Sequence, residues 1–167
     1  MFFLGCHLVD LVFGFQGIPE EIVPFNAKTG FDNVDVTDYG MAVLKYKNGI
    51  SFVKSTATEL GGGMRRQVVL CGEKGTIELK PTEMGYRHSY GRKNMRTIMY
   101  EIRKGDDRVE RTEIGPFNRY DAMMKSFSQM VNGERKNPYS YEYEVRLHRM
   151  IMKACGMDID YKKEIIL

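Results

Sequence analysis

Residues 39–58 read YGMAVLKYKNGISFVKSTAT, and this stretch decides the class of fold. Two runs rich in β-branched and aromatic residues, Tyr39 to Tyr46 and Ile50 to Thr58, flank the dipeptide Asn48-Gly49. Asn-Gly between two such runs is typical of a β-hairpin, because both residues tolerate the positive φ that a tight hairpin turn requires. The stretch therefore predicts two neighbouring antiparallel strands.

The same pattern continues along the chain as far as Ile114. Glycine-containing turns separate short runs of strand composition, and such short spacings favour hairpins over crossover connections. Further strands are expected at Gln67 to Cys71, Thr76 to Leu79, Met95 to Ile102 and Val109 to Ile114. Several runs carry apolar residues on both faces. One face of the sheet is therefore expected to cover helices and the other to meet a partner subunit, which predicts a homo-oligomer.

Helical spacing of apolar residues precedes and follows the strand region. An opening helix is expected from Leu4 to Phe15, ended by Gly17 and Pro19. Its core-facing stripe is expected to be Leu4, Leu8, Leu11, Val12 and Phe15.

Two more helices and a short strand are expected at the C-terminal end. Asn118 can cap the first helix and Ser140 the second, with Gly133 and Gly156 as their stops. The buried stripe of the first is expected to be Tyr120, Met123, Met124, Phe127, Met130 and Val131, and that of the second Tyr143, Leu147, Met150, Ile151 and Ala154. A final strand is expected over Tyr161 to Leu167. The order predicts one α+β domain over residues 1–167, a largely antiparallel open sheet with helices packed on one face.

Composition and charge narrow the class of protein. The 167 residues suit one ordinary globular domain, and a net charge of +3 is too small to argue for nucleic acid. From Arg87 to Arg111 there are eight basic and four acidic residues, which we interpret as solvated strand faces because no aromatic stacking platform accompanies them. No nucleic-acid partner and no membrane span are expected. Cys6, Cys71 and Cys155 show no paired spacing, which suits reduced thiols in a cytoplasmic protein.

One pair of residues could carry acid–base chemistry. One face of the opening helix is expected to lie opposite the leucine stripe. It carries four residues at offsets of four, three and four: Phe3, His7, Asp10 and Gly14. A carboxylate one turn from an imidazole can orient the ring or raise its basicity. A structural hydrogen bond is the commoner reading of such a spacing.

Loops offer weaker candidates for binding. Residues 61–63 are three glycines followed closely by Arg65 and Arg66, a pattern that fits an anion-binding nest but more often a flexible loop. No Gly-x-Gly-x-x-Gly fingerprint and no Walker loop occur, so no cofactor site and no metal site are expected in this chain.

Several of these segments, taken in order, resemble the C-terminal domain of the glucose–fructose oxidoreductase/inositol dehydrogenase (Gfo/Idh/MocA) family. The opening segment Gly5-Cys6-His7-Leu8-Val9-Asp10 with Gly17-Ile18-Pro19 is similar to its Gly-x-His-x-x-Asp…Gly-x-Pro pattern. The similarity continues through 38–49 and 69–79, and ends at Asn137-Pro138-Tyr139-Ser140 and the closing segment. Each piece is ordinary alone, and their order over nearly the whole chain makes the match specific.

The resemblance implies the C-terminal, dihydrodipicolinate-reductase-like domain of a two-domain enzyme. A separate Rossmann domain would bind NAD or NADP, and the substrate would be a sugar, polyol or related carbohydrate. His7 would assist proton transfer with Asp10 in support. Separately from the resemblance, the polarity and loop positions of Arg65, Arg66 and His88 make them candidate substrate-side groups. Many members have an aspartate four residues before the histidine that matches His7, and that aspartate forms the usual Asp–His proton relay. This chain has Phe3 at that position, so it lacks the acidic member of the relay.

Two further expectations concern the chain as a whole. It begins inside an apolar helical pattern with no capping residue, which predicts that it is part of a longer protein. Because it has no phosphate-binding loop to hold a dinucleotide, we expect it to be inactive alone. The alternative is a non-catalytic carbohydrate-binding or dimerisation module, which the phenylalanine at position 3 favours.

Overall fold

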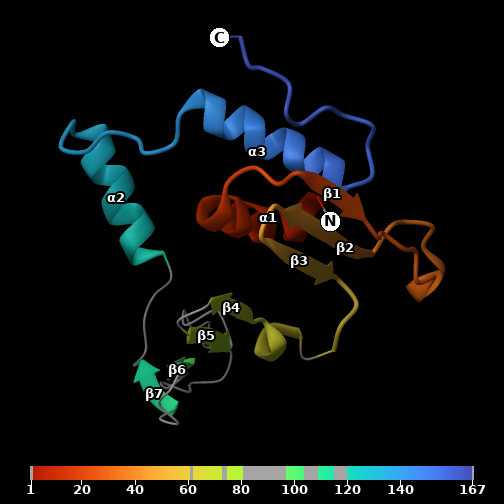
Figure 1. Cartoon of the computed structure of the whole chain (residues 1–167), viewed down its shortest axis with the longest axis horizontal. Coiled ribbons are helices and arrows are strands. Elements are labelled where there is room, and N and C mark those ends of the chain that lie inside the picture. The colour runs from red at the N-terminus through yellow and green to blue at the C-terminus, as the bar shows by residue number, and fades with distance from the viewer. Residues whose placement is uncertain are drawn as a thin grey trace. The chain divides into compact units, whose positions relative to one another are not determined.

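The computed structural model describes residues 2–60, 62–72, 75–80, 97–103, 109–114 and 120–166 (Figure 1). The chain forms two compact units. The first combines residues from both ends, 1–59 and 137–167, and the second consists of residues 60–136. The first unit is interrupted in sequence by the whole of the second.

The first unit is built on a three-stranded antiparallel sheet, β1 (Glu21–Pro24), β2 (Tyr39–Tyr46) and β3 (Gly49–Thr56), in the order β1-β2-β3. Tyr46 pairs with Gly49, so the predicted hairpin is confirmed. β1 was not among the strands expected from the sequence, because it has only four residues and ends in proline. Pro24 is tolerated there because β1 is an edge strand, where a missing N–H interrupts no ladder between two strands.

Two helices cover one face of this sheet, as the sequence predicted. They are α1 (Phe2–Gln16) and α3 (Tyr141–Ala154), which contact each other (Figure 1). The sheet contributes two inward-facing cross-strand pairs, Ile22 with Leu44 and Ala42 with Val53. These four side chains form one buried cluster with Val9, Met150, Ile151, Ala154 and Tyr161. The expected α+β class with helices on one face of an antiparallel sheet is confirmed.

The core-facing side of α1 agrees with the prediction only in part, because Leu8 and Val12 of the expected stripe pack against the core. Val9 is fully buried, whereas Leu4, Leu11 and Phe15 are 43%, 44% and 62% exposed. The buried side is therefore turned by about one residue, or 100°, from the predicted leucine stripe. Because α1 is apolar on nearly all sides, the sequence alone does not single out the face that packs.

The ends of α3 follow the predicted capping chemistry. Ser140 Oγ accepts a hydrogen bond of 3.1 Å from the Tyr143 backbone N–H, which satisfies one of the unpaired donors of the first turn. After the helix, Gly156 adopts φ +91°, a left-handed conformation that glycine takes without steric cost.

The C-terminal segment does not form the predicted strand. In the described residues 155–166 it is irregular, and side chains hold it in place. Arg146 of α3, only 9% exposed, donates from Nη1 to the carbonyl oxygens of Tyr161 at 2.8 Å and Lys163 at 2.9 Å. A strand was expected here, but these carbonyls accept hydrogen bonds from the arginine and not from a neighbouring strand.

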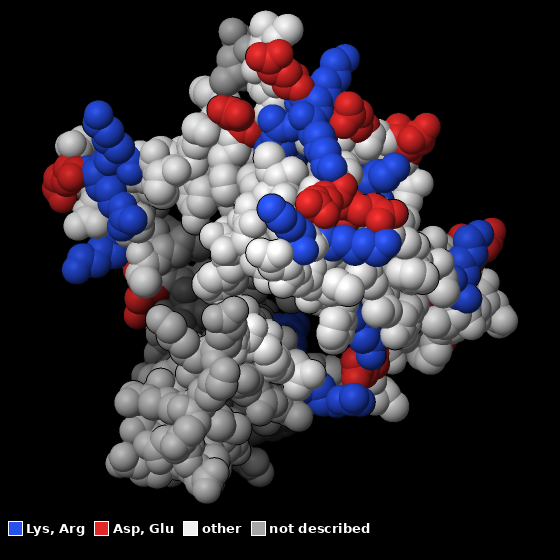
Figure 2. Space-filling model, in the orientation of Figure 1, with Lys and Arg blue, Asp and Glu red and all other residues white. Residues whose placement is uncertain are grey.

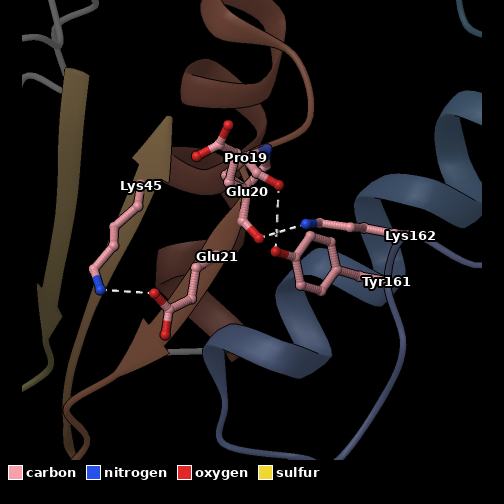
Figure 3. Close-up of polar contacts among 6 residues, drawn as sticks. All are labelled: Pro19, Glu20, Glu21, Lys45, Tyr161 and Lys162. Atoms are coloured by element: carbon pink, nitrogen blue, oxygen red, sulfur yellow. Dashed lines mark hydrogen bonds and ion pairs between the residues drawn. The ribbon is translucent and has the colours of Figure 1, made fainter. Parts of the chain in front are cut away.

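The same segment also reaches the start of β1 (Figure 3). The Tyr161 hydroxyl donates to the Pro19 carbonyl at 3.3 Å, and the Lys162 ammonium donates to the Glu20 carbonyl. These contacts join two parts of the chain that are about 140 residues apart in sequence.

The second unit contains a four-stranded antiparallel sheet and one helix. Its strands are β4 (Val68–Gly72), β5 (Gly75–Lys80), β6 (Thr97–Arg103) and β7 (Val109–Ile114), in the order β4-β5-β6-β7. All four predicted strands are confirmed, but the antiparallel ladder is divided between two sheets. Of the eight basic residues from Arg87 to Arg111, Arg103 ends β6 and Arg111 lies in β7, and the other six lie outside the described residues.

The helix of the second unit, α2 (Asp121–Val131), corrects a prediction about burial. No residue of α2 is buried, and its apolar residues other than Met130 are strongly exposed: Met123 and Met124 56%, Phe127 57% and Val131 69%. Periodicity indicates which residues share a face, and it does not tell whether anything covers that face. Tyr120 occupies the N-cap position, and Asn118 lies outside the described residues.

No helix within the described ranges combines the length and the apolar character needed to cross a membrane.

Candidate functional site

His7 lies on the exposed side of α1. At 100° per residue, Leu4, His7, Leu11 and Phe15 fall within an arc of about 80°, which we call the α1 stripe. Its three apolar members are 43–62% exposed. The leucines therefore border the histidine instead of lying opposite it, as the sequence had suggested. An ionisable ring stands within an uncovered apolar surface.

Asp10 lies beside this stripe and is half-buried. Its Oδ1 accepts a hydrogen bond from the hydroxyl of Tyr143 on α3. Among the described residues, no hydrogen bond or ion pair joins Asp10 to His7. The predicted pair thus shares a region of α1, but the carboxylate bonds to another helix.

Tyr143 is the site residue that sequence reasoning missed. It was assigned to the core stripe of α3, and it lies 133 residues from Asp10. Its ring stacks on Phe13 of α1, with 4.7 Å between centroids and 18° between planes. The Tyr139 ring lies 5.3 Å away on another side. A usable signal was present, since a tyrosine in a packed stripe generally needs a partner for its hydroxyl.

The surroundings of Tyr143 keep it protonated. Burial raises its pKa above the ordinary value of 10, and the hydrogen bond to the Asp10 carboxylate raises it further. A neutral hydroxyl donates to Asp10 at all physiological pH values.

The other predicted site residues belong to the second unit. Arg65 ends a short 3₁₀ turn (Gly62–Arg65), Arg66 follows it, and both side chains are exposed. His88 lies outside the described residues, as does Gly61 of the glycine triplet. His7 belongs to the first unit, so the two groups of predicted site residues are described separately.

A separate groove of about 680 Å³ runs between β1 and residues 153–162. Its charged groups are engaged locally: Lys153 lies 3.8 Å from Asp158, and Lys162 bonds the Glu20 carbonyl. Neither His7 nor Asp10 lines it. We therefore place the candidate acid–base chemistry on α1 and not in this groove.

The described surface in view shows neither a field of one charge nor a metal-binding cluster (Figure 2). On the face in view, lysines and arginines are interspersed with acidic residues, and no field of one sign forms over the described part (Figure 2). No group of three or more His, Cys, Asp or Glu side chains in that part could hold a metal ion. No disulfide joins the three cysteines, all of which lie in described ranges.

Comparison with known proteins agrees with this architecture. Residues 1–78 match the family model described as the GFO/IDH/MocA C-terminal domain. The resemblance seen in the sequence is thereby confirmed over the segment that contains His7 and Asp10. No curated protein sequence matches the chain.

Solved structures share the fold over nearly the whole chain. A Klebsiella pneumoniae protein, provisionally classified as an oxidoreductase, is 17% identical with a TM-score of 0.64 over 94% of this chain and 48% of its own. The provisional oxidoreductase YvaA from Bacillus subtilis is 15% identical, with a TM-score of 0.63 over 92% of this chain and 48% of its own.

A third similar structure has a defined ligand. KijD10, a 3-ketoreductase from Actinomadura kijaniata in complex with TDP-benzene and NADP, is 13% identical. Its TM-score is 0.58, over 91% of this chain and 43% of its own. At these identities the likeness establishes the fold, and the chain spans about half the length of the structures that it matches.

Proposed function

With residues 1–78 matching the GFO/IDH/MocA C-terminal domain, we propose that this chain is the substrate-facing domain of an NAD(P)-dependent oxidoreductase. The substrate would be a sugar, polyol or related carbohydrate. The observation that carries the proposal is the exposed His7 within the uncovered apolar α1 stripe. A titratable ring in such a surface suits a reaction site that a second domain closes.

A nucleotide-binding domain is the proposed cover of the α1 stripe. An exposed apolar helix face commonly marks a surface that another domain or subunit covers. The similar structures are about twice the length of this chain, so a further domain of comparable size is available in such proteins. NAD(P) would be held there, because this chain has no glycine-rich dinucleotide loop.

This chain would contribute proton transfer at the substrate. NAD(P), when bound, supplies the hydride chemistry. The His7 imidazole would take the proton from a substrate hydroxyl during oxidation and return it during reduction. The Asp10 carboxylate, three residues away on the same helix, would support His7 in this role. Arg65, Arg66 and His88 stay candidates for contacting the substrate, on the basis of loop position and polarity.

The test is activity of the protein that carries this chain together with its nucleotide-binding domain. With NADP(H) or NAD(H) and a panel of sugars and polyols, His7→Ala should lower kcat by about 10²–10⁴-fold. His148→Ala is the matched control, because His148 is an exposed histidine on α3 and not on the stripe. An unchanged rate in His7→Ala would remove the assignment.

A non-catalytic dimerisation module is the second candidate. Phe3 stands where many family members have an acidic residue, and the outer face of the β1-β2-β3 sheet carries exposed apolar residues among charged ones such as Lys45 and Lys54. Ile50 and Phe52 on that face are 70% and 68% exposed. A second copy would cover this face in either candidate, but only the module would lack dehydrogenase activity.

Sedimentation of this chain tests the sheet interface. Phe52→Glu should convert a dimer to a monomer, because it places a charge in the centre of an apolar contact. Phe31→Glu is the control, since Phe31 is 58% exposed but lies outside the sheet. Monomer for the unsubstituted chain at micromolar concentration would argue against the interface.

A further inference from the structure

We propose that Tyr143 is a positioning residue for the acid–base face of α1. Its hydroxyl holds the Asp10 carboxylate against α3 and so determines how closely that carboxylate approaches His7. The inference rests on the proposed role of His7 in proton transfer. It adds a residue that neither the spacing in the sequence nor the family match assigns.

Tyr143 is fixed at three points, which is what a positioning group needs. Its backbone N–H donates to the Ser140 cap at 3.1 Å. Its ring is stacked on Phe13 with centroids 4.7 Å apart. Its hydroxyl donates to Asp10 Oδ1. The ring cannot turn without losing the stacking contact. The direction of the hydroxyl is therefore set by α3, and with it the position of the Asp10 carboxylate.

The position of Asp10 matters because of its spacing from His7. Side chains three residues apart on a helix are neighbours, so an unrestrained aspartate there can pair directly with the imidazole. In the structure the carboxylate is bonded to Tyr143, and within the described part of the chain it makes no bond to His7. Tyr143 thus limits Asp10 to acting on His7 through its charge, and leaves the ring open to a substrate hydroxyl.

The restraint persists over the working pH range. The raised pKa of Tyr143 keeps its hydroxyl protonated and able to donate. Glu144 and Tyr139 are the neighbouring groups of α3 and its leading loop whose charges add to this effect, and Asp10 is the group that faces it from α1. All three neighbours favour the protonated Tyr143 hydroxyl, which therefore remains a hydrogen-bond donor.

The experiment follows the three histidine rings of this chain by NMR as pH is varied, with His7 assigned from His7→Gln. In Tyr143→Phe the ring and its stacking stay, but Asp10 is released. The His7 titration midpoint should then rise by about half a pH unit, because a carboxylate that reaches the imidazole favours its protonated form. In a chain that already carries Asp10→Asn, the same Tyr143→Phe change should leave the midpoint where it is.

Two results would overturn the proposal. One is an unmoved midpoint in Tyr143→Phe. The other is an equal displacement with and without the Asp10→Asn substitution, which would mean that the effect does not pass through the carboxylate. Tyr139→Phe is the control, because its ring contacts Tyr143 while Tyr143 remains the donor to Asp10. The measurement uses no substrate or cofactor, so its outcome is separate from that of the activity test of His7→Ala.

Discussion

Replacing Arg146 by methionine should detach the C-terminal segment from α3 while leaving the helix intact. The substitution keeps an unbranched stem of similar length in a buried position, and it removes the guanidinium. Arg146 donates to the carbonyls of Tyr161 and Lys163 at 2.8 and 2.9 Å. The substitution removes both hydrogen bonds. The free energy lost can be considered separately for each of the two carbonyl groups.

The two carbonyls do not lose the same amount. Lys163 keeps a second donor, because Arg149 Nη1 also bonds its carbonyl at 2.8 Å. The Tyr161 carbonyl loses its arginine donor, and Tyr161 is only 6% exposed. Leaving one buried acceptor without its charged donor costs about 2 kcal/mol. That is close to a 30-fold change in the equilibrium between the attached and the detached segment.

Hydrogen exchange measured by mass spectrometry on peptides from residues 157–166 reads this equilibrium directly. The backbone N–H groups of Ile159 and Lys162 are hydrogen-bonded within the segment, so they report its opening. Their exchange should be about 30-fold faster in Arg146→Met. Arg149→Met is the control and should change exchange by less than about threefold, because Arg146 still donates to Lys163. Equal exchange in the two variants would refute the reasoning.

Three further predictions concern the first unit. Leu44→Ala, at a fully buried position in the middle strand, should lower the free energy of unfolding by about 2–5 kcal/mol in urea titrations followed by circular dichroism, and a loss below 1 kcal/mol would contradict the assigned core. Burial raises the pKa of Tyr46 from 10 to about 12, so the fold binds this proton more tightly than the unfolded chain and loses stability as pH rises from 10 to 12. Tyr46→Phe should show a smaller loss over that window, and an identical pH profile would count against it. Gly156→Ala should destabilise by about 1–2 kcal/mol, measured by the same titration, because φ is +91°, although the new methyl group would make only ordinary van der Waals contacts with Asn26 and Pro24 at 4.0 Å.

The local chemistry of the chain was predictable wherever a short stretch carries its own signal. The hairpin at Asn48-Gly49, the Ser140 cap and the Gly156 stop each depend on a few neighbouring residues, and the structure confirms all three. The turn itself consists of Lys47 and Asn48, and neither they nor Gly49 adopt the positive φ that the prediction assumed. The antiparallel pairing of neighbouring strands was also predictable from the short connections, but the break between β3 and β4 that leaves two sheets was not. These features depend on contacts within a few residues.

What the sequence did not predict depends on partners far along the chain. The packed side of α1 is centred on Val9 and not on the leucines, since the helix is apolar almost all round and the sheet decides which side is covered. The link from Tyr143 to Asp10 spans 133 residues. The irregular C-terminal segment is held by Arg146, and nothing in the sequence of residues 161–167 indicates that an arginine of α3 binds their carbonyl groups. The α1 assignment of His7 and Asp10 as an acid–base pair remains a prediction.

The division of the first unit between the two ends of the chain has a consequence during synthesis. Residues 1–59 leave the ribosome with β1, β2 and β3 complete, but the helix that buries Ile22 and Leu44 ends at Ala154. At a typical 5–20 residues per second, α3 arrives roughly 5–20 s later. For that interval a half-covered apolar sheet is open to chaperones and to misassociation with other nascent chains. A slow codon stretch between residues 60 and 136 would lengthen this exposure, so translation speed in that region should influence the yield of folded protein.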